Sequence, residues 1–88
     1  MPTISTFFGI SVRMFFGDHP PPHFHVVYQR RRAVIGIESG RILQGFLPPG
    51  ALRIVVEWAT RHKSELQENW ERAQALLPLE RIRGADVE

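Results

Sequence analysis

The sequence contains no cysteine, and this absence excludes several classes of protein at once. Without thiols the chain has no disulfide framework, no thiolate nucleophile and no cysteine-based zinc site. A protein without disulfides suits a reducing compartment, so we expect it in the cytoplasm. Any metal site or catalytic site must be built from other side chains.

Long apolar runs and a strong excess of charge are missing as well. No stretch approaches the roughly 20 apolar residues of a membrane-spanning helix, and the segment Met1 to Ser5 lacks the features of a signal peptide. The formal net charge is only +2, which by itself is weak evidence for nucleic-acid binding. We therefore expect no membrane partner.

The residues that are present predict one small domain with a core of its own. The chain has 88 residues, of which 43% are hydrophobic. Alternating apolar and polar residues predict a four-stranded antiparallel β-meander over about residues 7–46. The strands are expected at residues 7–16, 23–29, 32–38 and 41–46, with turns at Arg30-Arg31 and Ser39-Gly40.

The register of the central hairpin separates an apolar face from a polar one. The predicted pairs are Val26–Ile35 and Phe24–Ile37 on the apolar face, which Ile42 and Phe46 join, and His23–Glu38 and His25–Gly36 on the other face. Because glycine has no side chain, this register predicts an open space beside His25.

After residue 48 the apolar spacing becomes helical and predicts helices over about residues 49–77. Ser64 to Gln67 fits a capping box, so a second helix is expected to begin near Glu65; one bent helix of about 26 residues is the alternative. His62 is expected to interact with the dipole of the first helix, and Trp58 and Trp70 are expected in the core.

A short C-terminal tail follows Pro78, which ends the helical part. Residues 79–82 are expected to form an edge strand or a docked tail, and residues from Arg83 onward are expected to fray. The predicted fold class is therefore α+β, with the C-terminal helices packed on one face of the sheet.

The segment from Asp18 to His25 carries more chemistry than any other part of the chain. It reads Asp-His-Pro-Pro-Pro-His-Phe-His. Three consecutive prolines form a stiff connector, and the strand that follows projects His23 and His25 on the same side. Asp18 and His19 precede the connector, and we expect them to fold back over the two histidines.

Two kinds of chemistry fit this cluster. Asp18, His19, His23 and His25 would supply the ligands of a divalent metal such as zinc. Alternatively, a ribonuclease-type hydrolase would use His25 as a base, His23 or Glu38 as its partner, and Arg13 or Arg41 as a phosphate clamp. The simplest alternative is structural: His25 bonds to the backbone, His23 pairs with Glu38, and the face is merely solvated.

Several stretches resemble a known family of small bacterial proteins, the domain of unknown function numbered 4160. The resemblance extends over roughly residues 2 to 82. It is carried by Pro2-Thr3-Ile4-Ser5, Phe7-Phe8-Gly9-Ile10, Asp18-His19, Pro21-Pro22-His23-Phe24-His25-Val26, Leu47-Pro48, Ala51-Leu52-Arg53, Glu57-Trp58-Ala59, Glu65-Leu66 and Asn69-Trp70. The family has no established activity. The resemblance implies a second small protein encoded nearby, in a toxin–antitoxin-like arrangement.

Our first interpretation is a small cytoplasmic bacterial protein that acts through this protein partner, as one half of a toxin–antitoxin-like pair. An endoribonuclease-type hydrolase that uses His19, His23 and His25 is the alternative from a different class, and a metal-binding module is the third. RNA and a second copy of the chain are the other partners considered.

Overall fold

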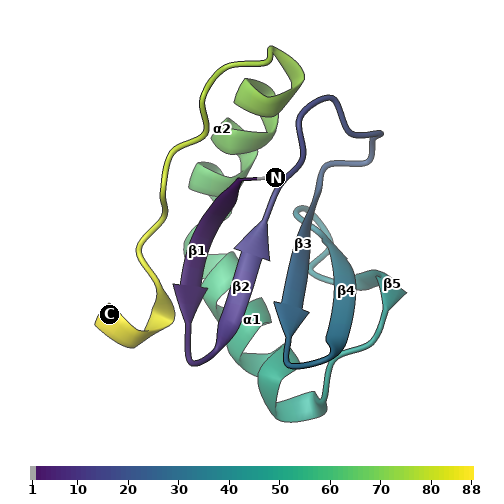
Figure 1. Cartoon of the computed structure of the whole chain (residues 1–88), viewed down its shortest axis with the longest axis vertical. Helices are drawn as coiled ribbons and strands as arrows, with labels where there is room; N and C mark the ends of the chain where they lie inside the picture. The colour runs from purple at the N-terminus through teal and green to yellow at the C-terminus, as the bar shows by residue number, and fades with distance from the viewer. Residues whose placement is uncertain (1) are drawn as a thin grey trace.

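The computed structural model describes residues 2–88, which form an antiparallel sheet backed by two helices (Figure 1). The strands follow one another across the sheet in the order of the sequence. They are β1 (Thr3–Phe7), β2 (Ile10–Arg13), β3 (His23–Tyr28), β4 (Arg31–Gly36) and β5 (Ile42–Gly45). The helices are α1 (Pro49–Arg61) and α2 (Lys63–Gln74), and a short 3-10 turn, η1 (Ala85–Val87), lies near the end. The α+β class is confirmed, and the number of strands is corrected from four to five.

The extra strand arises because the predicted strand over residues 7–16 is in fact part of a hairpin. Phe7 of β1 pairs with Ile10 of β2, and Phe8 and Gly9 form the two-residue loop between them. Both loop residues have positive φ angles, 53° and 76°, a geometry that matches the twist of a tight hairpin. Phenylalanine rarely adopts such a φ, so the alternation of apolar residues gave no sign of this turn.

The register of the β3–β4 hairpin differs from the predicted one by two residues. The observed pairs are His23–Gly36, Phe24–Ile35, His25–Val34 and Val26–Ala33, and the loop is Gln29-Arg30. A shift of two residues leaves every side chain on its predicted face but changes its partner. Glu38 therefore does not face His23. Gly36 lies opposite His23 and is packed against Ser39 and Leu43, so this glycine does not create the open space predicted beside His25.

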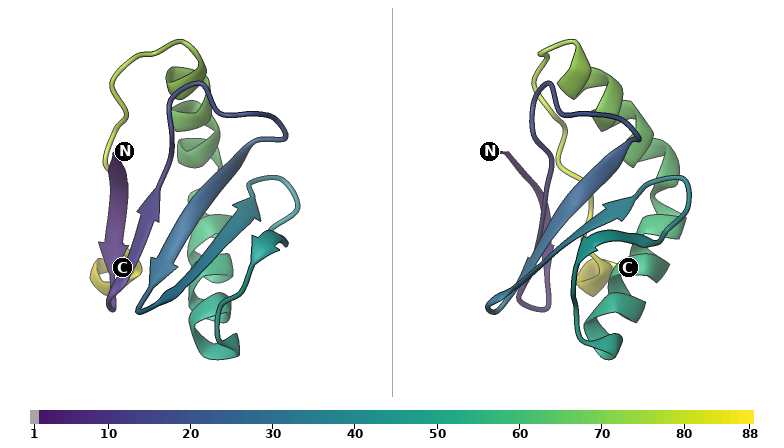
Figure 2. Two further views of the ribbon diagram at one scale, coloured as in Figure 1. Left: turned by 45° about the vertical axis from the view of Figure 1, so that its right-hand side comes forward. Right: turned by 90° about the vertical axis from the view of Figure 1, so that its right-hand side faces the viewer.

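The core lies between the sheet and the helices, which cover the same face of the sheet (Figure 2). Phe24, Val26 and Ile35 are completely buried there, as predicted. Trp58 of α1 is also fully buried, and its ring centroid lies 5.0 Å from that of Phe7. Trp70 of α2 is buried as well, so both tryptophans belong to the core. Phe46 is an exception to the predicted apolar face, because 52% of it is exposed.

The helical part is divided at His62, so the prediction of two helices is confirmed. His62 has φ and ψ angles of −112° and 26°, which depart from helical geometry, so α1 ends before it and α2 begins after it. The predicted capping box is wrong: α2 begins at Lys63, and no side chain caps it. Within residues 2–88, no helix has both the length and the apolar character needed to cross a membrane.

The C-terminal tail docks beside β1, which confirms the docked tail predicted as one alternative for residues 79–82, while the residues from Arg83 onward are held as well instead of fraying (Figure 1). The backbone N–H of Ile82 donates to the Ile4 carbonyl at 2.8 Å, and the Ser5 hydroxyl donates to the Ile82 carbonyl at 2.8 Å. The indole N–H of Trp58 donates to the Arg83 carbonyl, also at 2.8 Å. These bonds use buried polar groups of the core to hold the tail.

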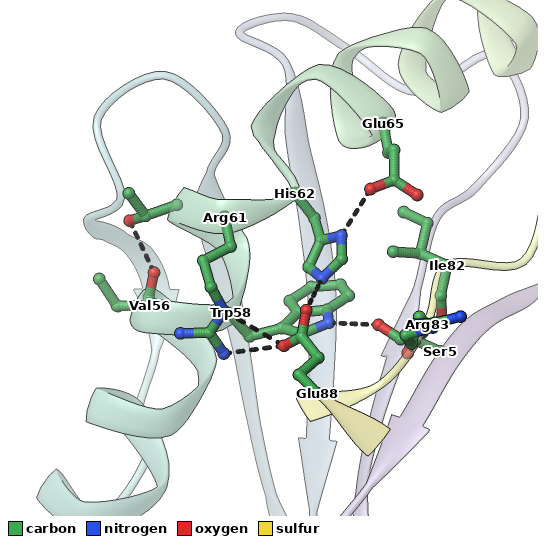
Figure 3. Close-up of polar contacts among 10 residues, drawn as sticks. Ser5, Val56, Trp58, Arg61, His62, Glu65, Ile82, Arg83 and Glu88 are labelled. Atoms are coloured by element: carbon green, nitrogen blue, oxygen red, sulfur yellow. Dashed lines mark hydrogen bonds and ion pairs between the residues drawn. The ribbon is translucent and has the colours of Figure 1, made fainter. Parts of the chain in front are cut away.

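The last residue of the chain bonds to the junction of the two helices (Figure 3). The two ring nitrogens of His62 each lie 2.5 Å from a carboxylate oxygen, one of Glu65 and one of Glu88. Burial disfavours the charged imidazole, but the bonds to Glu65 and Glu88 outweigh it and raise the pKa of His62. A second bond, from Arg61 to Glu88 at 2.9 Å, completes this carboxylate clamp.

Candidate functional site

Three polar side chains meet where the loop that joins β2 to β3 leads into β3. One carboxylate oxygen of Asp18, Oδ2, lies 2.8 Å from Nε2 of His23 and 3.1 Å from Nε2 of His25. The three potential ligand atoms all lie within 4.8 Å of one another. The predicted convergence is therefore confirmed for Asp18, His23 and His25, which we call the histidine–aspartate cluster.

The loop that carries Asp18 is tied to the C-terminal end of α2. The N–H of Gly17 donates to the Ala73 carbonyl at 3.1 Å, and the Gln74 side chain donates to the Asp18 carbonyl at 2.9 Å. Further along, the N–H of Ile37 donates to the Pro22 carbonyl at 3.0 Å and fixes the loop to the sheet. Asp18 thus approaches the two histidines from a segment held at both ends.

Aromatic rings hold the two imidazoles in place. The ring of His23 lies 5.2 Å from that of Trp70, and the ring of His25 lies 4.1 Å from that of Phe15, measured between centroids. His23 is buried and His25 is partly exposed. Apolar surroundings strengthen the polar contacts inside the cluster, because less water competes for them.

The protons of His23 are constrained by its two neighbours. Its Nδ1 lies 2.8 Å from the Pro21 carbonyl oxygen, which can only accept, so Nδ1 carries a hydrogen. Its Nε2 faces Asp18, whose pKa is lowered to about 2: burial opposes this, but hydrogen bonds from His25, the His19 backbone and His23 outweigh it. The Asp18 carboxylate is therefore ionised at neutral pH and only accepts.

Two arrangements satisfy the contact between Nε2 of His23 and Asp18. In the first, Nε2 also carries a hydrogen, and the imidazole is a cation. In the second, the ring is neutral and a metal cation takes the place of that hydrogen, bound by the lone pair of Nε2. The donor set of one carboxylate oxygen and two imidazole nitrogens suits zinc and similar divalent metals.

The other predicted site residues lie around the cluster or away from it. His19 contributes its backbone N–H, which donates to Oδ1 of Asp18 at 2.9 Å, and its imidazole is not among the three converging groups. Arg13 lies directly beside His25 on β2. Glu38 is exposed and bonds instead to Lys63 and Gln67 of α2, at 3.1 and 3.4 Å. The predicted pairing of Glu38 with His23 was therefore wrong. Arg41 is exposed to solvent.

Sequence reasoning missed the groups that orient the histidines. The Pro21 carbonyl and the rings of Phe15 and Trp70 all contact the cluster. Trp70 was predicted as a core residue only, since a helical apolar spacing says nothing about which side chain lies across from it. The one available signal was Pro21, two residues before His23. Proline has no backbone N–H to donate, but its carbonyl oxygen can still accept a hydrogen bond from a nearby side chain.

Comparison with known proteins gives one result. No curated protein and no solved structure matches the chain. The model of one protein family, described as a domain of unknown function, matches residues 9–71 and so includes the whole histidine–aspartate cluster, β2 to β5, α1 and most of α2. This chain therefore belongs to the DUF4160 family.

Proposed function

We propose that this protein binds a divalent metal ion, such as zinc, through Asp18, His23 and His25. The observation that carries the proposal is the bond between Nδ1 of His23 and the Pro21 carbonyl. Metal-binding histidines commonly donate their second ring nitrogen to a carbonyl or carboxylate, which fixes the lone pair of the first toward the ion. In a neutral His23 ring the lone pair would lie on Nε2, the nitrogen 2.8 Å from Asp18 Oδ2, so an ion there could be shared by both residues.

The distances inside the cluster are close to those of a metal site. Ligands bound at about 2.0–2.2 Å in a tetrahedron lie roughly 3.4 Å apart. The contacts of Asp18 with the two histidines, at 2.8 and 3.1 Å, would open by about 0.6 and 0.3 Å, and the widest separation in the set, which is within 4.8 Å, would have to shrink toward this value. Three protein ligands leave a fourth position free for water or a small ligand, as in catalytic zinc sites.

Metal content of the purified whole chain tests this proposal. We expect about one zinc per chain after incubation with zinc and desalting. The variants Asp18→Asn, His23→Gln and His25→Gln should lose it, while His19→Gln is a matched control that changes a neighbouring exposed imidazole. Far-UV circular dichroism confirms that each variant is folded. Zinc retained by folded His23→Gln and His25→Gln, or absent from the unaltered chain, would rule the site out.

A second candidate function concerns a protein partner, and the edge of the sheet favours it. We infer that this is a cytoplasmic bacterial protein that forms one half of a toxin–antitoxin-like pair. β5 is the last strand of the sheet; Leu43 within it and Phe46 directly after it are 47% and 52% exposed. An edge strand with exposed apolar side chains can accept an extended segment of another protein.

Co-expression with the small protein that this proposal expects to be encoded nearby tests the second candidate. Leu43→Glu places a charge on the β5 edge and should abolish co-purification of that protein. Phe8→Glu is the control, because Phe8 is also exposed but lies at the β1–β2 loop. Equal loss in both variants, or in neither, would exclude the β5 edge as the contact.

A further inference from the structure

The open face of the sheet carries a pocket of about 300 Å3 next to the histidine–aspartate cluster. Its lining crosses four strands in one row: Arg13 on β2 pairs with His25 on β3, His25 pairs with Val34 on β4, and Val34 pairs with Gln44 on β5. His25 therefore belongs both to the cluster and to the wall of the pocket.

Two guanidinium groups give this pocket a positive charge. Arg13 and Arg32 line it, together with the His25 imidazole, and no carboxylate does. Within residues 2–88, neither arginine forms an ion pair. The Nε atom of Arg13 is buried and has no hydrogen-bond partner there. An unsatisfied buried donor costs free energy, so a rotation that brings the Arg13 guanidinium to an acceptor, such as an anion in the pocket, would be favourable.

Apart from Gln44, the rest of the lining is apolar and partly aromatic. Val27 and Val34 form part of its lining, and Phe15 lines it beside His25. A ligand that fits must combine an anionic group for the two guanidiniums with a flat, weakly polar group for these side chains. Guanidinium groups favour phosphate because their paired N–H donors match its oxygens.

We infer that this pocket binds one nucleotide, with its phosphate between Arg13 and Arg32 and its base against Phe15, Val27 and Val34. The volume lies at the lower limit for small-molecule sites, which suits a mononucleotide better than a dinucleotide. The nucleotide is either free or one residue of a single-stranded RNA. Binding rests on the arginines, so it does not require the proposed metal, although the shared His25 places the phosphate next to that ion.

Binding measurements with and without metal separate this inference from the metal proposal. The probes are adenosine monophosphate, a short single-stranded RNA and inorganic phosphate, titrated into the whole chain in the presence of a chelator and again with zinc. Arg32→Gln and Arg13→Gln should each weaken nucleotide binding by at least about tenfold, because each removes a charge-assisted contact. Arg30→Gln is the matched control, since Arg30 lies outside this pocket on the same hairpin.

Each outcome has a defined meaning. Nucleotide binding that persists in chelator and depends on Arg32 supports the pocket even if no metal binds. Much tighter binding of RNA than of the mononucleotide, with a steep salt dependence, shows that the bound nucleotide is one residue of a single-stranded RNA. Inorganic phosphate that binds as tightly as adenosine monophosphate would overturn the nucleotide assignment. The pocket itself is excluded if no probe binds, or if Arg30→Gln weakens binding as much as Arg32→Gln does. Arg32 is exposed, so its variant keeps the test valid if Arg13→Gln fails to fold.

Discussion

The imidazole of His23 donates from Nδ1 to the Pro21 carbonyl, two residues earlier in the chain, at 2.8 Å. This contact decides what the other ring nitrogen can do. With the hydrogen fixed on Nδ1, Nε2 of a neutral ring has only a lone pair to offer Asp18. A protonated ring would hold Asp18 through a second N–H, whereas a neutral ring would hold it through a shared metal ion, and the metal proposal requires the neutral ring.

Zinc should stabilise the unaltered chain, and His25→Gln should abolish that stabilisation. At a concentration of 100 times the dissociation constant, a single site adds about 2.7 kcal/mol to the free energy of unfolding. In chelator, we expect the stability of His25→Gln to change by no more than about 1 kcal/mol, because glutamine keeps a polar side chain at a partly exposed position. Thermal unfolding with zinc and with chelator measures both effects. A large loss of stability in chelator would instead make the cluster a structural clasp for the proline loop.

Truncating Ile35 to alanine should destabilise the fold by roughly 2–5 kcal/mol. Ile35 is completely buried in the middle of the sheet, so the change leaves a cavity under the helices. Leu43→Ala is the matched control on the adjacent strand. Because the Leu43 side chain is half exposed, its truncation should lower the free energy of unfolding by no more than about 0.5 kcal/mol. Urea unfolding of both variants gives the comparison, and similar costs for the two would contradict the packing described above.

Replacing Gly45 with alanine should disrupt the pairing of β5 with β4. Gly45 has a φ angle of 87°, and a β-carbon there would lie 2.2 Å from the Arg32 carbonyl oxygen, a backbone atom that cannot move aside. We expect a cost of at least about 2 kcal/mol. Gly50→Ala is the control: no atom lies within 4 Å of its added β-carbon, and alanine in a helix should stabilise by up to about 1 kcal/mol. Denaturant unfolding should therefore give opposite signs for the two variants.

The contribution of His62 to stability should depend on pH in a defined direction. Its pKa in the folded chain is raised above 6.5, so its stabilising effect is complete below pH 6.5 and is lost as the pH rises through the raised value. The pKa of Glu88 is lowered from 4.5 by its bond to Arg61 and its contacts with His62, so its effect is present above pH 4.5 and is lost as the pH falls through the lowered value. The stability difference between the unaltered chain and His62→Gln should be largest from pH 4.5 to 6.5 and should shrink above it.

Thermal unfolding across this pH range tests the assignment, and Glu38→Gln is the control. The exposed pair of Glu38 with Lys63 contains no imidazole, so its loss should have nearly the same effect at pH 6 and pH 8. A His62→Gln difference that grows above pH 6.5 would contradict the paired imidazolium described for this position.

The two faces of the sheet could be predicted from the sequence, but the pairing of its strands could not. Side chains alternate with a period of two, so a register error of two residues leaves Phe24 and His25 on the correct faces while giving both the wrong partners. Strand β1 was missed for a related reason, because the unbroken alternation through Phe8 concealed a turn with positive φ angles. The His-x-His spacing and the preceding aspartate were sufficient to find the cluster. Glu38 was assigned to it only through the wrong register.

The other features that could not be predicted depend on contacts between distant parts of the chain. The docked tail depends on bonds from Ile82 to Ile4 and from Trp58 to Arg83, and no local pattern near residue 83 signals them. The buried edge of β1 and the clamp at Glu88 are therefore properties of the assembled fold. The same holds for the ring of Trp70, which reaches His23 from a helix that begins 40 residues after that histidine.

The attachment of the Asp18 loop to α2 makes the cluster sensitive to the spacing between the two layers of the fold. Gly17 and Asp18 are hydrogen-bonded to Ala73 and Gln74 at the end of α2, whereas His23 and His25 belong to the sheet. An ion held by all three residues would therefore bridge helix and sheet. By thermodynamic reciprocity, any ligand or partner that shifts α2 against the sheet changes the affinity for the ion, and the ion changes the affinity for that partner by the same factor.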